Sequence, residues 1–243
     1  MALRSYLDGK LLAEVYGTPP PRILALHGWG RRGNDFAKSL GALSTIAPDL
    51  PGFGATPPPG EAIGAQGYAD SIAGLLEEFD VPPVVVGHSF GGRVALCLAA
   101  THPRLVGSVV LTGVPLVRLA PRRGPSWGYR LARMANRAGL YPDDRMERLR
   151  HRRGSADYQA ANGVMRDVLV KVVNETYEDQ LRSIDMPVHL LWGADDGEVP
   201  VAVAHTAARL LADSDLRVLP GVGHFVPSEA PEELRATVEG TLQ

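Results

Sequence analysis

Residues 84–92 read Val-Val-Val-Gly-His-Ser-Phe-Gly-Gly, and this stretch decides the fold. A β-branched apolar run leads into a tight turn, and the residues after the turn have a helical pattern. A strand, a turn and a helix with a serine at the tip is the setting in which G-x-S-x-G is typical of a nucleophilic serine, here Ser89. The strained backbone of such a serine requires very small neighbours, as Gly87 and Gly91 are, and Gly92 lets the helix lie close to the strand. The alternative interpretation is a glycine-rich loop between a strand and a helix.

A nucleophilic serine needs a histidine as its base, and the histidine needs a carboxylate that holds its tautomer. Residues 188–192 read as a buried strand that runs into an acidic turn at 193–200. A last strand at 216–219 is followed by Gly-Val-Gly-His224. In the fold that uses this serine turn, the order along the chain is serine, acid, histidine. Ser89, the acidic turn at 193–200 and His224 each follow a strand. Catalytic groups in open α/β sheets lie at the carboxyl ends of strands.

Five segments in this order resemble the α/β-hydrolase superfamily, of the single-domain type that bears a cap. They are His27-Gly28-Trp29-Gly30, Asp49-Leu50-Pro51-Gly52-Phe53-Gly54, the Ser89 turn, Trp192-Gly-Ala-Asp-Asp196 with Pro200, and Gly223-His224. The resemblance implies an α/β-hydrolase fold, with a mostly parallel central sheet, helices on both faces and a helical cap inserted after the sixth strand. One departure is Phe53, where the family often has histidine.

The resemblance also assigns the acid. The family pattern G-x-x-D, with a proline four residues after the acid, falls on Asp196. Its neighbour Asp195 is interpreted as a solvated turn carboxylate or a helix cap, and Glu198 is a more distant third candidate. The implied catalytic residues are therefore Ser89, Asp196 and His224.

An oxyanion needs two backbone N–H donors aimed at one point. The resemblance places one on Phe90, directly after the serine, and the other on Trp29. The Trp29 side chain is also expected to wall the acyl pocket, and the alternative interpretation of this tryptophan is simple packing.

The other histidines and the single cysteine favour structural roles. We expect His27 and His88 to hold the loops next to them, and His102 to end the helix that follows Ser89. Cys97 lies mid-helix and is expected to be a small buried apolar residue. No metal-ligand spacing is found among the remaining histidines, which are His151, His189 and His205.

Composition excludes several classes of protein. A hydrophobic fraction of 45% is enough for a sizeable core, and a net charge of −2 indicates neither nucleic-acid nor membrane binding by itself. One cysteine rules out an intrachain disulfide, so nothing indicates an oxidising compartment. The first residues lack the pattern of a signal peptide, and no apolar run approaches the roughly 18 residues that span a bilayer. We therefore expect a cytoplasmic protein.

Alternating strand and helix patterns indicate a parallel sheet, preceded by a hairpin at Asp8-Gly9. Strands are expected near 2–7, 11–16, 22–27, 44–47, 83–87, 106–112, 187–192 and 215–219. Helices are expected near 33–42, 65–79, 90–101, 200–212 and 231–242.

Residues 114–184 break this rhythm, because they are longer than a crossover requires and helical in pattern. The expected organisation is a core of 1–113 and 185–243 with a helical cap at 114–184. The segment 118–153 carries a local charge of about +8, from eleven arginines against Asp143, Asp144 and Glu147. In one interpretation these arginines form a solvated face. In the other, some of them hold an anionic substrate, such as a carboxylate, a phosphopantetheine or an acidic carrier protein.

The implied activity is cleavage of a carboxylic ester through an acyl-enzyme, with no cofactor or metal. The expected partner is a small-molecule ester, either neutral or, in the second interpretation, anionic or carrier-bound. The loop at 27–30 and the basic cap are loosely similar to carboxylesterases of the biotin pathway. A serine nucleophile argues against the dehalogenase and epoxide hydrolase branches, which use aspartate. The alternatives are a carbon–carbon bond hydrolase, lactonase, thioesterase or perhydrolase, a non-hydrolytic biosynthetic enzyme, and a ligand-binding member of the fold.

Overall fold

A computed structural model describes residues 2–119, 131, 134–136, 140–142, 145 and 156–242 of the 243-residue chain. Eight strands form one sheet in the order β1-β2-β4-β3-β5-β6-β7-β8. The strands are β1 (Ala2–Tyr6), β2 (Leu11–Tyr16), β3 (Ile23–Leu26), β4 (Thr45–Pro48), β5 (Val84–His88), β6 (Ser108–Thr112), β7 (Val188–Gly193) and β8 (Ser214–Leu219).

The sheet is mostly parallel, as the sequence predicted. Only β2 runs antiparallel to its neighbours β1 and β4, and every pair from β4 to β8 is parallel. The register pairs Gly87 of β5 with Leu26 on one side and Leu111 on the other. The turn after β5 therefore emerges at the middle of the sheet, at the carboxyl end of the parallel strands, where α/β folds build their sites.

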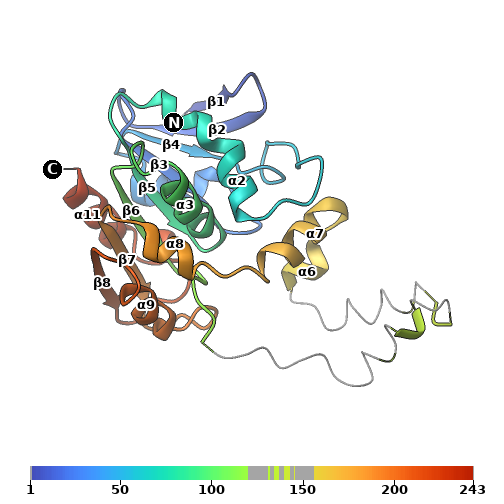
Figure 1. Cartoon of the computed structure of the whole chain (residues 1–243). Helices are drawn as coiled ribbons and strands as arrows, with labels where there is room; N and C mark the ends of the chain where they lie inside the picture. The colour runs from blue at the N-terminus through green and yellow to red at the C-terminus, as the bar shows by residue number, and fades with distance from the viewer. Residues whose placement is uncertain are drawn as a thin grey trace.

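Helices cover both faces of the sheet. One face packs against α2 (Ala65–Ile72), α3 (Phe90–Thr101), α8 (Glu178–Ser183) and α9 (Val201–Ala208). The other face packs against η1 (Gly33–Phe36), α1 (Ala37–Leu40), α10 (Val226–Glu229) and α11 (Pro231–Thr241). Figure 1 shows the molecule from the side of α2, α3 and α8.

The strands β3, β4, β5 and β6 are buried at every position and largely apolar, because both of their faces are covered. In β3, Leu24 and Leu26 belong to the core cluster beneath α2 and α3, whereas Ile23 and Ala25 belong to the cluster beneath α1 and α11. This alternation follows from the two-residue repeat of a strand. It explains why these strands read as largely apolar runs in the sequence.

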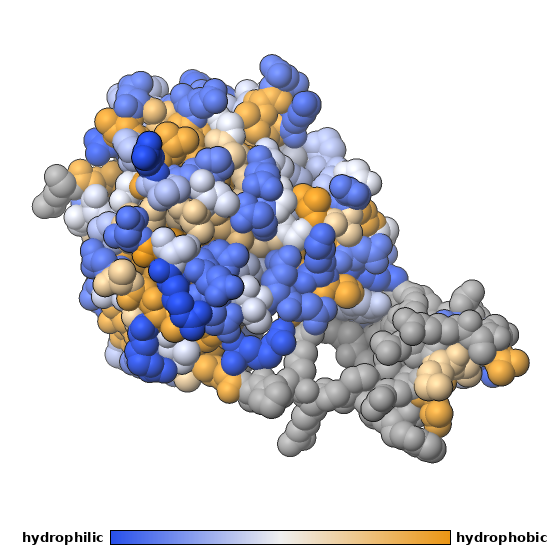
Figure 2. Space-filling model, in the orientation of Figure 1, coloured by the Kyte–Doolittle hydropathy of each residue, from blue (hydrophilic) through white to orange (hydrophobic). Residues whose placement is uncertain are grey.

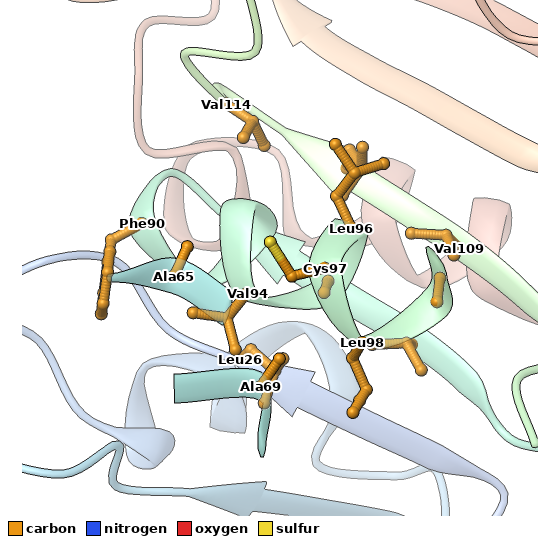
Figure 3. Close-up of a cluster of buried hydrophobic side chains, with 14 of the residues drawn as sticks. Leu26, Ala65, Ala69, Phe90, Val94, Leu96, Cys97, Leu98, Val109 and Val114 are labelled. Atoms are coloured by element: carbon orange, nitrogen blue, oxygen red, sulfur yellow. The ribbon is translucent and has the colours of Figure 1, made fainter. Parts of the chain in front are cut away.

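Helix α3 is buried along most of its length, because the sheet lies on one side of it and α2 and α8 lie on the other. Its Cys97 is 1% exposed and is a free thiol. Figure 3 shows the Cys97 sulfur among apolar side chains of this cluster, which include Val94 and Leu98. The expectation of a small buried apolar residue is confirmed.

Three described helices lie between β6 and β7: α6 (Ala156–Ala160), α7 (Gly163–Val172) and α8. In Figure 1, α6 and α7 lie together to one side of the sheet. The inner face of α7 packs into the main core cluster through Val168 and Val172, and Leu181 of α8 joins the same cluster. This part of the long connection is therefore continuous with the core that α3 builds.

Two polar contacts hold the end of α7 to the core. Arg93 of α3 donates through Nη1 to the carbonyl of Val172, at 2.7 Å. The Glu175 carboxylate accepts from the amide of Ala65, at 3.0 Å, and from the hydroxyl of Tyr177, at 2.8 Å. The first turn of α2 and the helix after Ser89 are thus tied to the segment that returns towards β7.

The expected elements agree with the structure in kind and differ at their ends. The expected helix at 33–42 is a 3-10 turn followed by one turn of α1, and the expected helix at 65–79 continues beyond α2 as η2 (Ala73–Glu78). His102 ends α3, as expected, with its amide bonded to the carbonyl of Leu98. The short helix α10, directly after His224, was not predicted.

Figure 2 shows the face seen in Figure 1, where the coloured surface is largely hydrophilic with apolar residues scattered among polar ones. Scattered apolar side chains are usual on a folded protein. Within the described residues, no helix combines the length and the apolar character needed to cross a lipid bilayer.

Candidate active site

Ser89 stands at the turn between β5 and α3, in a backbone conformation that side chains rarely adopt. Its φ is +49° and its ψ is −112°. The turn is held from both sides, because the Ser89 amide donates to the carbonyl of Thr112 at 2.9 Å and the Ser89 carbonyl accepts from the amide of Gly92 at 3.1 Å. Strain of this kind costs of order 1–3 kcal/mol and is typical of functional positions.

The glycines around Ser89 are there because nothing larger fits. A Cβ on Gly87 would lie 2.5 Å from the Cα of Gly92, and one on Gly91 would lie 2.1 Å from the carbonyl oxygen of Leu26. A Cβ on Gly92 would lie 2.2 Å from a methyl group of Val114. The close packing expected from the sequence is therefore what the structure contains.

Asp196 and His224 are hydrogen-bonded to each other in a buried position. The Oδ2 atom of Asp196 lies 2.9 Å from Nδ1 of His224. The Oδ1 atom accepts from the amides of Glu198, at 2.9 Å, and Val199, at 2.8 Å. A carboxylate held in this way keeps the proton of the imidazole on Nδ1, so that Nε2 is left as a base.

The histidine loop is fixed by a carboxylate that the sequence analysis did not identify. Glu229 of α10 accepts from the amide of Gly223, at 2.6 Å, and from the amide of Phe225, at 3.0 Å. Room for the His224 ring comes from Gly113, which directly follows β6 and has a φ of +58°. A Cβ on Gly113 would lie 2.8 Å from Cε1 of His224 and 3.3 Å from Oδ2 of Asp196.

The three acidic candidates of the turn after β7 have different positions. Asp196 bonds to Nδ1 of His224, whereas Asp195 is exposed and uses its amide to bond the carbonyl of Val222 at 2.9 Å. Glu198 has a side chain that is 64% exposed, and its carboxylate lies 3.5 Å from Nε2 of His224. The imidazole therefore has a carboxylate near each of its nitrogens.

Ser89 and His224 line the same pocket, which has a volume of about 380 Å³. The other residues that line it are Gly28, Trp29, Arg31, His88, Ala156, Asp157, Glu198 and Phe225. The pocket is thus built from the turns after β3, β5, β7 and β8 together with α6. Asp157 carried no sequence signal, because only the fold brings α6 to the serine.

Trp29 and Phe90, the two expected amide donors, are neighbours. Phe90 is the first residue of α3, so its amide has no carbonyl to bond within the helix. The rings of Trp29 and Phe90 meet edge to face, with centroids 5.4 Å apart. Phe53 lies edge to face against Trp29, at 4.9 Å, and Tyr68 lies in the same way against Phe90, at 4.9 Å. Of these four aromatic residues, Trp29 lines the pocket and the other three are buried.

His27 holds the loops on this side of the site, as expected. Its Nδ1 donates to the carbonyl of Gly28, at 2.8 Å, and its Nε2 accepts from the amide of Leu50, at 2.9 Å. Burial lowers the pKa of His27 from 6.5 to about 4, so the ring is neutral near pH 7. A neutral ring is required, because Nε2 acts as an acceptor.

His88 is also buried and neutral. Its Nδ1 lies 3.1 Å from the carbonyl of Thr112, and its ring centroid is 4.9 Å from that of His224. Burial, followed by the proximity of His224, lowers the pKa of His88 to about 3.

Two of the eleven arginines expected in the cap at 118–153 belong to the part of the chain that the structure describes. Arg118 and Arg145 are described and do not line the pocket, and the other nine lie outside the described residues. Among the described side chains, no group of three or more histidine, cysteine, aspartate or glutamate residues is arranged to hold a metal ion.

The fold agrees with what known proteins show. Residues 23–237 match the model of the alpha/beta hydrolase family, and the chain belongs to that family. It is 30% identical to the non-heme chloroperoxidase of Streptomyces lividans, over 86% of each chain. It is 28% identical to the pimeloyl-[acyl-carrier protein] methyl ester esterase of Aromatoleum aromaticum, over 92% of this chain and 98% of that one.

A similar solved structure is that of a putative lipase from Acinetobacter baumannii, with a TM-score of 0.75. It covers 99% of this chain and 90% of its own length, at 20% identity. At that identity the likeness concerns the fold alone. Membership of the family makes this chain a hydrolase.

Proposed function

We propose that the protein is a serine hydrolase that cleaves a carboxylic ester through an acyl-enzyme. The observation that carries this proposal is the hydrogen bond between Asp196 and Nδ1 of His224, at 2.9 Å, in a pocket that Ser89 also lines. A buried carboxylate, an oriented imidazole and a serine on a strained turn are the parts that nucleophilic catalysis by serine requires.

In the proposed reaction, Oγ of Ser89 attacks the ester carbonyl carbon and passes its proton to Nε2 of His224. The amides of Trp29 and Phe90 stabilise the oxyanion. The bond to the leaving alcohol then breaks as His224 returns the proton to the alcohol oxygen. Water attacks the acyl-enzyme, gives a proton to His224 and releases the acid, and Ser89 recovers its proton. Asp196 orients the imidazole and stabilises its charged form.

We also propose that residues 114–184 serve as a cap over a core formed by 1–113 and 185–243. Support comes from α6, which contributes Ala156 and Asp157 to the lining of the pocket. A cap that lines the site chooses the substrate and excludes water. The anionic or carrier-bound substrate remains a prediction from the arginines, because the described pocket contains none of those in the cap.

The test is turnover of p-nitrophenyl esters of increasing acyl length by the wild type and by Ser89→Ala, with the exposed Ser183→Ala as the matched control. We expect Ser89→Ala to lose about 10⁴-fold or more in kcat, as removal of a catalytic serine does, while Ser183→Ala matches the wild type. Mass spectrometry of a quenched reaction should show the acyl group on Ser89. Turnover by Ser89→Ala at the wild-type rate would refute the proposal. Turnover of a natural substrate without an acyl-enzyme would favour non-hydrolytic chemistry.

A further inference from the structure

Glu198 places a carboxylate beside the nitrogen of His224 that acts as the base. Its Oε2 atom lies 3.5 Å from Nε2 of His224, and both residues line the pocket that Ser89 also lines. The reaction proposed above gives Glu198 no role, because Asp196 already bonds the other nitrogen of the ring. A second carboxylate at Nε2 therefore calls for an explanation of its own.

The backbone that carries Glu198 is fixed by two buried side chains. The amides of Glu198 and Val199 both donate to Oδ1 of Asp196, at 2.9 and 2.8 Å. The carbonyl of Val199 accepts from Nε1 of the fully buried Trp192, at 2.9 Å. Asp196 and Trp192 thus hold the turn from which the Glu198 side chain reaches the imidazole.

When the imidazole is neutral, the two facing atoms are both hydrogen-bond acceptors. Nδ1 of His224 lies 2.9 Å from the carboxylate of Asp196, which can only accept, so the ring proton is on Nδ1 and Nε2 has a lone pair. The ionised carboxylate of Glu198 also can only accept. Two acceptors 3.5 Å apart cannot bond to each other, but a molecule that donates two hydrogen bonds can join them.

Water is such a molecule, and the proposed reaction brings a water to Nε2 once the alcohol has left. One O–H of this water must point to Nε2 of His224, which takes its proton. If the other O–H points to Glu198, both hydrogens are engaged and a lone pair is left to face the acyl group, which is the orientation that attack requires. An alcohol has one hydrogen on its oxygen and cannot join both acceptors.

We propose that Glu198 is a catalytic residue that orients the water for hydrolysis of the acyl-enzyme, and that it favours water over alcohols as the acyl acceptor. The inference rests on the proposed function and adds a residue to its second step. The water oxygen bonds to the acyl carbon while one proton passes to Nε2 of His224. The bond from this carbon to Oγ of Ser89 then breaks, and His224 returns the proton to Oγ. The second hydrogen stays on the acid that forms, so Glu198 accepts a hydrogen bond and is not itself protonated.

Competition between water and methanol for the acyl-enzyme tests this role. With p-nitrophenyl acetate in aqueous methanol, the acyl-enzyme gives acetic acid with water and methyl acetate with methanol. The initial ratio of methyl acetate to acetic acid is set in the second step alone, so it does not depend on how fast the acyl-enzyme forms. Ser89→Ala supplies the uncatalysed background for both products.

Three variants locate the effect. In Glu198→Ala the ratio of methyl acetate to acetic acid should rise by about three- to tenfold, as expected for loss of a partly solvated hydrogen bond to a charged group. Glu198→Leu restores most of the bulk without an acceptor, and the ratio should rise in the same way. Asp195→Ala removes a carboxylate from the same turn but outside the pocket lining, and the ratio should stay at the wild-type value.

The outcomes separate this inference from the proposed function. An unchanged product ratio in Glu198→Ala, with Ser89-dependent hydrolysis retained, would overturn the inference and leave the proposed function standing. A rise that Asp195→Ala shares would assign the effect to the charge of the turn, and a rise that Glu198→Leu abolishes would assign it to space for methanol. Either result would also overturn the inference. If the wild type forms no acetic acid in a Ser89-dependent reaction, both proposals are wrong.

Discussion

Asp196 and His224 are joined by a hydrogen bond, and two backbone amides that bind the other oxygen of the carboxylate fix its geometry. Oδ2 of Asp196 lies 2.9 Å from Nδ1 of His224, while the amides of Glu198 and Val199 hold Oδ1. The carboxylate therefore has no freedom to rotate away from the imidazole. The turn after β7 and the loop after β8 are coupled by this contact.

Replacement of Asp196 by asparagine should lower kcat on p-nitrophenyl acetate by about 10⁴-fold, because an amide in this position favours the wrong imidazole tautomer. Asp195→Asn is the matched control and should retain the wild-type kcat. Circular dichroism of the two variants should coincide. An equal loss of kcat in both variants would mean that the charge of the turn, rather than the hydrogen bond to His224, determines the rate.

Gly113 should be needed for activity because the absence of a side chain there leaves room for the His224 ring. In Gly113→Ala the new Cβ would collide with the His224 ring, where the gap to Cε1 is 2.8 Å. Gly163 has a similar φ of +51° but nothing within 4 Å of its missing Cβ. Both changes to alanine should therefore destabilise the protein by about 1–2 kcal/mol, measured by urea unfolding, but only Gly113→Ala should displace His224 and lose kcat. Full activity of Gly113→Ala would contradict this account of the site.

The neutral buried histidines should make the protein less stable in acid. Burial holds the pKa of His27 at about 4 and that of His88 at about 3, against about 6.5 in an unfolded chain. The unfolded state therefore binds more protons below pH 6.5. The stability from each neutral ring is complete above that pH and is lost as the pH falls towards the folded pKa. Each histidine should lower the free energy of unfolding by about 1.4 kcal/mol per pH unit between about pH 6 and 4.

Urea unfolding at pH 7.5, 6 and 5 measures this loss. In His27→Gln, the free energy of unfolding should fall less steeply with decreasing pH, by roughly 1.4 kcal/mol per pH unit, which corresponds to one proton. In the exposed His205→Gln, this slope should be unchanged. A slope in His27→Gln equal to that of the wild type would show that this ring does not titrate as described.

Cys97 should be inert while the protein is folded. Burial raises the pKa of its thiol to about 12, and the side chain is 1% exposed. We expect its reaction with Ellman's reagent at pH 8 to be about a thousandfold slower than that of a free thiol, since the thiolate is the reacting form. Cysteine introduced at exposed Ser183 provides the reactive control, and unfolding in guanidinium should release Cys97. Rapid labelling of the native wild type would refute the prediction.

The parts of the fold that the sequence could predict are those with a local cause. The turn at Ser89 could be recognised because steric demand on Gly87 and Gly91 appears directly as glycine in a fixed pattern. The same is true of the central strands, whose burial on both faces appears in the sequence as largely apolar runs. The expected positions of these strands match the structure to within about two residues.

The parts that could not be predicted depend on distant contacts. Glu229 bonds the loop of His224 from a helix that has only four residues, and no local pattern marks so short an element. Asp157 reaches the serine pocket only because α6 lies over it. Gly113 is one glycine among 27, and only the position of the His224 ring explains why it is needed.

Two hydrogen bonds fix the returning end of the long connection after β6. Arg93 bonds the carbonyl of Val172, and Glu175 bonds the amide of Ala65. They bind its returning end to the helices of the hydrolase core and do not involve the residues before α7. An exchange of the residues before Gly163 that retains α7 and Glu175 would leave both contacts in place. The start of α7 is therefore the junction at which the proposed cap could be exchanged between members of the family.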